Sequence, residues 1–324
     1  MDRRGFLKSG TALILSVPAA KAAAAGWIPA VAGDGLKTGS GMVKAAGTAK
    51  ATGRTLRFGM VTDPHFARRR ENIGRYYLDS AVKMQQAVDY FRGQDLDFII
   101  ELGDFKDMSP AKDPAEALGY LDSIEQVFQS YGGPAYPVLG NHDMDCISKS
   151  EFLSRTANPG RAAGRSWYSF ARKGVRCIVL DANFKKDLTP YDRGNFSWKS
   201  ATIPPEQLAW LDAELSSHPR QRTLIFVHQR LDSFSGDDRH YFVLNAAEVV
   251  SVLERHPQVL AVFQGHCHEG GYSLRSGIHY WTTPAMVAGE WPLHNSYAVV
   301  EVSPDGEIRI QGFKDCPSLP AGRA

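Results

Sequence analysis

The stretch Ala135–Asp143, AYPVLGNHD, joins a short apolar run to a glycine and a cluster of polar residues. An apolar run of this length predicts a buried β-strand. Four other apolar runs also end in Asp or His, and they are Leu56–His65, Phe98–Asp104, Thr223–His228 and Val259–His268. Because ligands gather at the carboxyl ends of strands in α/β sheets, we expect the polar side chains that follow these five runs to converge on one site.

The segments between the apolar runs have helical periodicity. Within Gly74–Gly93, apolar residues recur at spacings of three and four. Asp113 followed by Pro114 predicts a helix start, and Pro205 predicts another. The alternation of strands and helices predicts an α/β domain, which we place at residues 55–315, with a tail at 316–324.

The N-terminus has the features of an export signal. Arg3 and Arg4 precede a modestly apolar run, Thr11–Ala20, and the alanine-rich Ala22–Ala25. This order predicts a twin-arginine signal peptide at residues 1–25, hence contact with the twin-arginine translocation machinery and a periplasmic or other extracytoplasmic location. Residues 26–54 contain few large apolar side chains and predict a flexible linker.

The positive charge of the chain lies in these two N-terminal segments. The whole chain has a formal net charge of +2. Residues 1–25 and 26–54 each contain four bases and one acid, so residues 55–324 have a net charge of −4. We therefore expect no nucleic-acid-binding surface on the domain.

Four cysteines occur in the domain region, at positions 146, 177, 267 and 316. In an exported protein they could form disulfides. Their spacing identifies no pairs, so buried free thiols are the alternative.

The residues after the five apolar runs suit metal binding. Carboxylate oxygens and imidazole nitrogens bind manganese, iron and zinc. The available groups exceed the need of one tetrahedral ion and match two ions that share a carboxylate. Asp104 follows a glycine at a strand end and could be the shared ligand. The candidates are Asp63, His65, Asp104, Asn141, His142, Asp143, His228, His266 and His268.

In order along the chain these residues form D-x-H, G-D, G-N-H-D, a lone histidine and G-H-x-H. This set resembles the calcineurin-like metallophosphoesterases. The resemblance implies an α/β fold with two mixed β-sheets packed together and flanked by helices. It also implies a phosphoester or pyrophosphate hydrolase whose nucleophile is a hydroxide bridging two divalent or trivalent ions, either manganese, iron or zinc.

The resemblance further implies a role for each residue. One metal would bind Asp63, His65, Asp104 and His268, and the other would bind Asp104, Asn141, His228 and His266. His142 would face the substrate as an acid and charge stabiliser. Asp143 would orient His142.

A narrower resemblance concerns the substrate. Four further segments are similar to the manganese-dependent ADP-ribose/CDP-alcohol diphosphatases: Arg75–Tyr77, Leu180–Ala182, Gln207–Leu211 and Glu269–Tyr272. They imply a small phosphorylated substrate with a nucleoside-diphosphate linkage. Some members of that group have glutamine where this chain has His65, which puts the first metal site in doubt.

Two alternatives remain open. One is a broad exported phosphomonoesterase or phosphodiesterase that scavenges phosphate, and the other is a non-catalytic metal-binding protein. The presence of His142 favours an enzyme over the second alternative. Candidate substrate contacts are Tyr76, Lys106, Phe196, Arg230 and Trp291.

Overall fold

The computed structural model describes residues 53–162, 164–235 and 241–322. The signal peptide and nearly all of the linker expected at residues 1–54 lie outside these ranges. In the described part, no helix is both long and apolar enough to cross a membrane. The four cysteines are separate, buried free thiols, so the alternative without disulfides holds in this structure.

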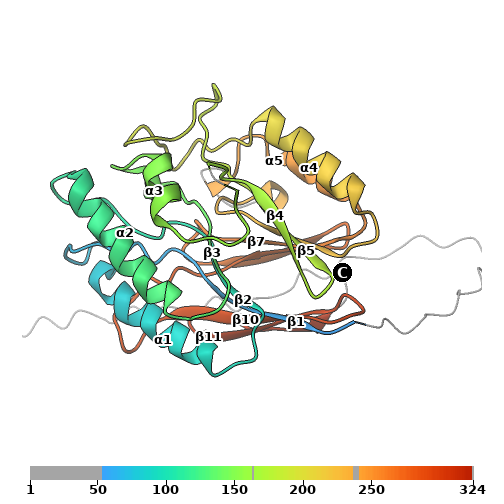
Figure 1. The fold of residues 1–324 in the computed structure, drawn as a ribbon, viewed down its shortest axis with the longest axis horizontal. Helices are drawn as coiled ribbons and strands as arrows, with labels where there is room; N and C mark the ends of the chain where they lie inside the picture. Colours follow the sequence, from blue (N-terminus) through green and yellow to red (C-terminus); the bar gives the residue numbers. More distant parts are fainter. Residues whose placement is uncertain (1–52, 163, 236–240, 323–324) are drawn as a thin grey trace, which may run out of the picture. The chain divides into compact units, whose positions relative to one another are not determined.

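The strands form two mixed six-stranded sheets, as expected (Figure 1). In order along the first sheet, the strands are β12 (Leu319–Gly322), β11 (Ile308–Lys314), β10 (Ser296–Val302), β1 (Leu56–Val61), β2 (Phe98–Glu101) and β3 (Ala135–Pro137). In the second they are β4 (Tyr168–Arg172), β5 (Val175–Val179), β6 (Thr223–Phe226), β7 (Val259–Gln264), β9 (Ile278–Thr282) and β8 (Gly271–Arg275).

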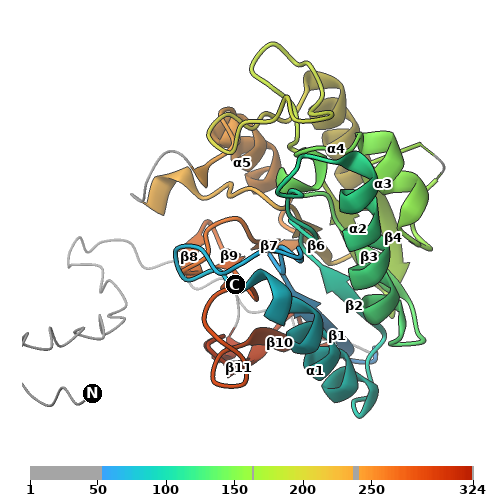
Figure 2. The ribbon, with the colours of Figure 1, turned by 90° about the vertical axis from the view of Figure 1, so that its left-hand side faces the viewer.

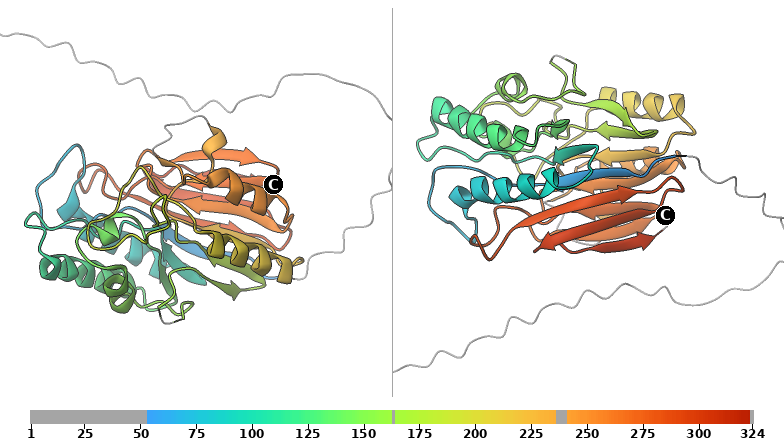
Figure 3. Two further views of the ribbon diagram at one scale, coloured as in Figure 1. Left: turned by 90° about the horizontal axis from the view of Figure 1, so that it is seen from above. Right: turned by 60° about the horizontal axis from the view of Figure 1, so that its bottom comes forward.

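The direction of the strands decides where their ends lie. In the first sheet β1, β2 and β3 run parallel, and β10 pairs antiparallel with β1, although the two are far apart in the sequence (Figure 3). In the second sheet β5, β6, β7 and β9 run parallel. The pairing of β12 with β11 places part of the segment expected to be a tail in the first sheet.

Helices cover the outer face of each sheet. The helices are α1 (Ser80–Arg92), α2 (Pro114–Gln129), α3 (Lys149–Arg155), α4 (Pro205–Ser217) and α5 (Ala246–Glu254). Figure 2 shows α1, α2 and α3 beside one another, and α1 and α2 pack on the first sheet through residues such as Phe91 and Leu121. The other two, α4 and α5, cover the second sheet through Leu211 and Val249.

The core between the two sheets is rich in phenylalanine. Phe58 of β1 stacks on Phe98 of β2 with ring centroids 4.8 Å apart. It also meets Phe226 and Phe263 of the second sheet edge-on, at 5.6 and 5.5 Å. Offset and edge-to-face contacts between buried rings stabilise such a core, which fixes the two sheets and the loops at their ends relative to each other.

The helix expected from Gly74 begins later, at Ser80, after a single 3-10 turn at Tyr77–Asp79. Gly74 has a φ of 75°, and its carbonyl accepts a hydrogen bond from Gly289. Tyr76 donates its backbone N–H to Val287. Hydrogen bonds to the loop after β9 therefore replace those of the expected first helical turns.

Candidate metal centre

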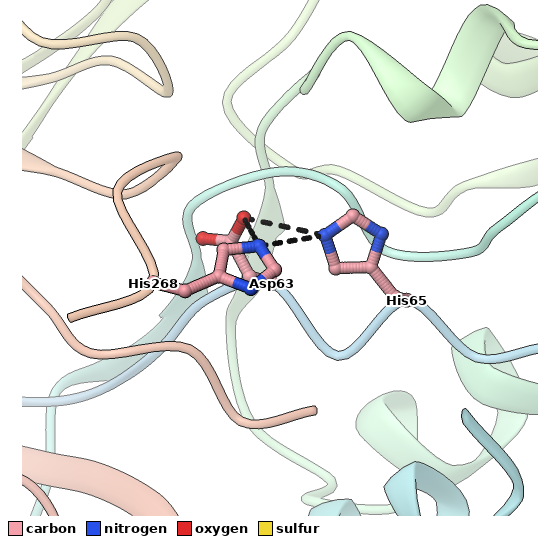
Figure 4. Close-up of side chains that lie close together, drawn as sticks. All are labelled: Asp63, His65 and His268. Carbon is pink, nitrogen blue, oxygen red and sulfur yellow. Dashed lines mark hydrogen bonds and ion pairs between the residues drawn. The ribbon is translucent and has the colours of Figure 1, made fainter. Parts of the chain in front are cut away.

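The predicted metal ligands lie in the loops that follow β1, β2, β3, β6 and β7. Asp63 and His65 follow β1, and His268 follows β7, so the first group joins the two sheets (Figure 4). The Nε2 atoms of His65 and His268 each lie 3.5 Å from Asp63 Oδ1. The two nitrogens are 3.2 Å apart. Three ligand atoms thus converge on one point.

A second group lies beside the first. It contains Asp104, His228 and His266, all buried. His228 Nε2 is 3.2 Å from Asp104 Oδ2, and the same oxygen is 3.4 Å from His65 Nε2. One carboxylate oxygen therefore borders both groups, which is the arrangement expected for a carboxylate shared by two metal ions.

Hydrogen bonds orient the imidazole rings in both groups. His65 Nδ1 lies 3.0 Å from Asp107 Oδ2, and His228 Nδ1 donates to the Leu102 carbonyl at 2.9 Å. These contacts leave the Nε2 atoms of His65 and His228 directed toward Asp104. A ligating histidine commonly has its other ring nitrogen held in this way.

The donor set fits metal ions. Among the described residues, buried acceptor atoms without a hydrogen-bond partner include Asp63 Oδ1, His228 Nε2 and Asn141 Oδ1. An unpaired buried polar atom costs free energy that a bound cation would offset. The oxygen and nitrogen donors are those that manganese, iron and zinc accept.

The charges of the site favour cations at its centre. Burial on its own lowers the pKa of His65, but the carboxylates of Asp104, Asp107 and Asp63 outweigh it and raise the pKa to about 10. The pKa of His228 is raised to about 9 against the same effect of burial, first by Asp104. The buried carboxylates therefore stabilise positive charge near them.

Glycines allow the ligand loops to approach one another closely. A Cβ on Gly140 would lie 2.1 Å from the Asp104 backbone nitrogen. A Cβ on Gly265 would lie 2.2 Å from Thr62 Oγ1 and 2.7 Å from Asp63 Oδ2. The glycines at positions 140 and 265 are therefore a steric requirement of the site.

His142 lies beside the two groups, in a 3-10 turn at His142–Met144. Its backbone N–H donates to Asp104 Oδ1 at 2.7 Å. Its ring Nδ1 faces Asp107 Oδ2 at 3.7 Å and Asp145 Oδ2 at 3.8 Å. The side chain is 20% exposed, so it is accessible from the cavity above the ligands.

Asp143 does not orient His142 as the sequence led us to expect. Its carboxylate accepts backbone hydrogen bonds from Gly140 at 2.8 Å and Phe105 at 2.9 Å, and so joins two ligand loops. In a 3-10 helix residues i and i+3 lie on the same side. Asp145, three residues after His142, therefore shares its side, whereas Asp143 points away from it.

Two adjoining cavities lie over the ligands. The first has a volume of about 350 Å³ and is lined by His142 and Trp198. The second, of about 460 Å³, is lined by Glu269 and Ala288. The residues that line both are Ile73, Arg75, Tyr241, His266 and His268. The two cavities therefore meet over the metal ligands.

The substrate contacts expected from the sequence lie mostly elsewhere. Phe196 packs on the His142 ring, with centroids 5.1 Å apart. Lys106 and Arg230 are buried in ion pairs with Asp145 and Asp232. Tyr76 and Trp291 line neither cavity. The residues that sequence reasoning did not assign to the site include Asp107, Asp145, Trp198 and Tyr241, and it gave no role to Arg75.

Known proteins are similar to this chain in sequence and in fold. Residues 56–270 match the family described as calcineurin-like phosphoesterase. A manganese-dependent ADP-ribose/CDP-alcohol diphosphatase of Arabidopsis thaliana is 26% identical over 270 residues, covering 71% of this chain and 86% of that protein. A 3′,5′-cyclic-nucleotide phosphodiesterase of Nostoc sp. is 28% identical over 193 residues, covering 59% of this chain and 63% of that protein.

A dimetal phosphatase from Danio rerio has a similar fold. Its crystal structure superposes with a TM-score of 0.68 at 22% sequence identity, over 83% of this chain and 99% of that one. Because the family match spans residues 56–270 and the two ligand groups share one carboxylate, this chain belongs to the calcineurin-like phosphoesterase family and is a dimetal phosphoesterase.

Proposed function

We propose that this enzyme hydrolyses the diphosphate linkage of small molecules in which a nucleoside diphosphate is joined to a second group, such as ADP-ribose or CDP-alcohols. The paired cavities carry this proposal. A diphosphate with a substituent at each end requires space on both sides of the reacting phosphorus atom, and the cavities of about 350 and 460 Å³ meet over His266 and His268. The similarity to manganese-dependent ADP-ribose/CDP-alcohol diphosphatases supports the same substrate class, and it supports manganese as the metal.

The proposed ligand sets follow the two groups of side chains. Asp63, His65, Asp104 and His268 would hold one ion, and Asp104, Asn141, His228 and His266 would hold the other. When bound, the two ions supply an acidified water as nucleophile and electrostatic stabilisation of the phosphoryl oxygens.

His142 is the proposed general acid. Its Nδ1 faces Asp107 and Asp145. This leaves Nε2 to donate a hydrogen bond or a proton to the leaving oxygen. Its backbone N–H is held by Asp104, so the position of the ring is tied to that of the shared ligand.

The experiment compares kcat/KM of the purified, manganese-loaded chain for ADP-ribose, CDP-choline, p-nitrophenyl phosphate and bis(p-nitrophenyl) phosphate. We expect the diphosphates to lead by about tenfold or more, equivalent to roughly 1.4 kcal/mol in the transition state. If the simple esters equal or exceed them, the diphosphatase assignment is wrong. A His142→Ala variant with unchanged metal content should lose most of this activity.

A second candidate function is a phosphodiesterase or phosphomonoesterase that acts outside the cytoplasm. The similarity to 3′,5′-cyclic-nucleotide phosphodiesterases favours it. The twin-arginine pattern also favours it, because intracellular nucleotide-linked substrates would be scarce there. We propose an extracytoplasmic location on the same pattern. Replacing both Arg3 and Arg4 by lysine should then retain the protein in the cytoplasmic fraction, and unchanged fractionation would contradict export by this route.

A further inference from the structure

The wall of the first cavity that does not consist of metal ligands comes from distant parts of the chain. Arg75 lies between β1 and α1, Trp198 between β5 and α4, and Tyr241 between β6 and α5. Loops that line a cavity over a rigid centre commonly determine which substrate is bound. The chemistry of these three side chains therefore indicates the kind of group that lies against them.

Arg75 presents a guanidinium group at the junction of the two cavities. Its backbone is fixed, since its N–H donates to Asn72 at 3.1 Å and it forms a β-bridge with Ala288. Among the described residues, no carboxylate pairs with its side chain. Arg69 differs, because it pairs with Asp107 at 3.2 Å and packs on Tyr77.

An unpaired, half-buried guanidinium at this place suits a phosphate. Its planar fork can bind two phosphoryl oxygens at once, which an ammonium cannot do. The phosphorus that is attacked must lie at the metal ligands. Arg75, which lines both cavities together with His268, is placed for the other phosphate of a diphosphate.

Trp198 lines the first cavity, and Lys199 Nζ lies 4.6 Å from the centroid of its ring. Trp198 is 40% exposed, and its backbone carbonyl accepts a hydrogen bond from His266 Nε2 at 3.1 Å. Tyr241 lies beside it, with ring centroids 6.1 Å apart and an interplanar angle of 41°. Because aromatic side chains at such positions stack with nucleobases, this pair suits a planar ring at a fixed distance from the metal centre.

We propose that Arg75 binds the phosphate of the substrate that is not attacked, and that Trp198 with Tyr241 stacks its nucleobase. The substrate class in this assignment rests on the proposed function. The base lies in the first cavity, and the second substituent of the diphosphate lies in the cavity lined by Glu269 and Ala288.

Trp198 and Tyr241 form the proposed base platform. It is tested with two ligands that differ only in the base, AMP and ribose 5-phosphate. Their affinities for the manganese-loaded chain are measured by calorimetry and as inhibition of hydrolysis. Trp198→Ala should weaken AMP binding roughly tenfold and change ribose 5-phosphate less than about twofold. Trp198→Phe, which keeps a ring, should retain most of the AMP affinity. Trp291→Ala is the matched control, because Trp291 is also 40% exposed but lines neither cavity.

The phosphate contact is tested by kcat/KM for ADP-ribose and p-nitrophenyl phosphate. Arg75→Ala should lower the value for ADP-ribose by tenfold or more and that for the monoester by less than about threefold. The kcat/KM of Arg75→Lys for ADP-ribose should lie between the values of Arg75→Ala and wild type. Arg70→Ala is the control, because Arg70 is exposed in the same segment and lines neither cavity.

The outcomes separate this assignment from the proposed function. If wild type prefers p-nitrophenyl phosphate to ADP-ribose, the proposed function fails, but the comparison of AMP with ribose 5-phosphate still tests the platform. If wild type prefers ADP-ribose while Trp198→Ala weakens both ligands equally or neither, the platform is wrong. Equal losses on both substrates in Arg75→Ala would overturn the phosphate assignment.

Discussion

The buried ion pair next to His142 provides a sharp test of how that ring is positioned. Lys106 Nζ donates to the His142 carbonyl at 2.7 Å and pairs with Asp145. Both charged side chains are fully buried. Lys106→Met leaves the Asp145 charge without a partner, and breaking a buried pair in this way costs about 3–5 kcal/mol of stability. Urea unfolding should show a loss of this size.

The double variant Lys106→Met/Asp145→Asn separates stability from catalysis. It removes both charges, so we expect most of the lost stability to return, leaving a deficit of about 1–2 kcal/mol from the missing hydrogen bonds. His142 still lacks its tether and the carboxylate 3.8 Å from Nδ1. A displacement of about 1 Å at such a group can cost on the order of 100-fold, so kcat should stay at least tenfold low.

A matched control is available at Lys149. It pairs with the buried Asp181 at 2.6 Å, and neither residue lines the cavities over the metal ligands. Lys149→Met should lower stability similarly and leave kcat per folded molecule unchanged. If the double variant regains wild-type kcat with wild-type metal content, the Lys106 pair only stabilises the fold and its positioning role is refuted.

Three other changes test the metal centre and the core. Gly140→Ala should displace Asp104 and lower bound manganese at least twofold by elemental analysis, whereas Gly119→Ala, with open space around it, should not. Chelation should lower stability by about 3 kcal/mol relative to protein with manganese at 100 times its Kd, and an unchanged Tm would contradict binding to the folded state. Burial raises the pKa of Glu125 to about 7 from 4.5, so the folded protein keeps a proton that the unfolded chain releases, and stability falls as pH rises through this window. Glu125→Gln should therefore match wild type near pH 4.5 and exceed it by up to about 3 kcal/mol at pH 8 in urea unfolding, and equal stabilities at pH 8 would refute this.

The metal centre was predictable because its ligands depend on regular structure. Each ligand motif follows an apolar run, and all five runs end beside parallel neighbours within their sheets. Parallel strands bring their carboxyl ends to one edge whatever the length of the connections. The sequence therefore predicts the convergence of Asp63 with His268, although 204 positions separate them along the chain.

Local secondary structure was harder to predict from the sequence where tertiary hydrogen bonds replace those of the helix that the periodicity indicates. The segment from Gly74 to Asp79 has helical spacing, but its backbone bonds to the loop after β9 instead. The short helix α3 was missed, although Ser148 and Glu151 form a capping box that the sequence displays. The side on which Asp143 lies depends on the 3-10 geometry after Asn141, which periodicity does not reveal.

Substrate contacts were the least predictable part because they depend on loops from unrelated segments. Arg75, Trp198 and Tyr241 follow no common spacing, and an arginine or tryptophan in a loop is more often a surface residue than a contact. Lys106 and Arg230 look equally suitable in the sequence, yet buried carboxylates neutralise both. The ligands at the strand ends determine the chemistry, whereas the loops above them determine which phosphorylated molecule reaches it. Enzymes with the same ligand motifs can therefore differ in substrate, and the unpaired Arg75 at the junction of the two cavities is the feature by which this chain should distinguish a diphosphate from a simple ester.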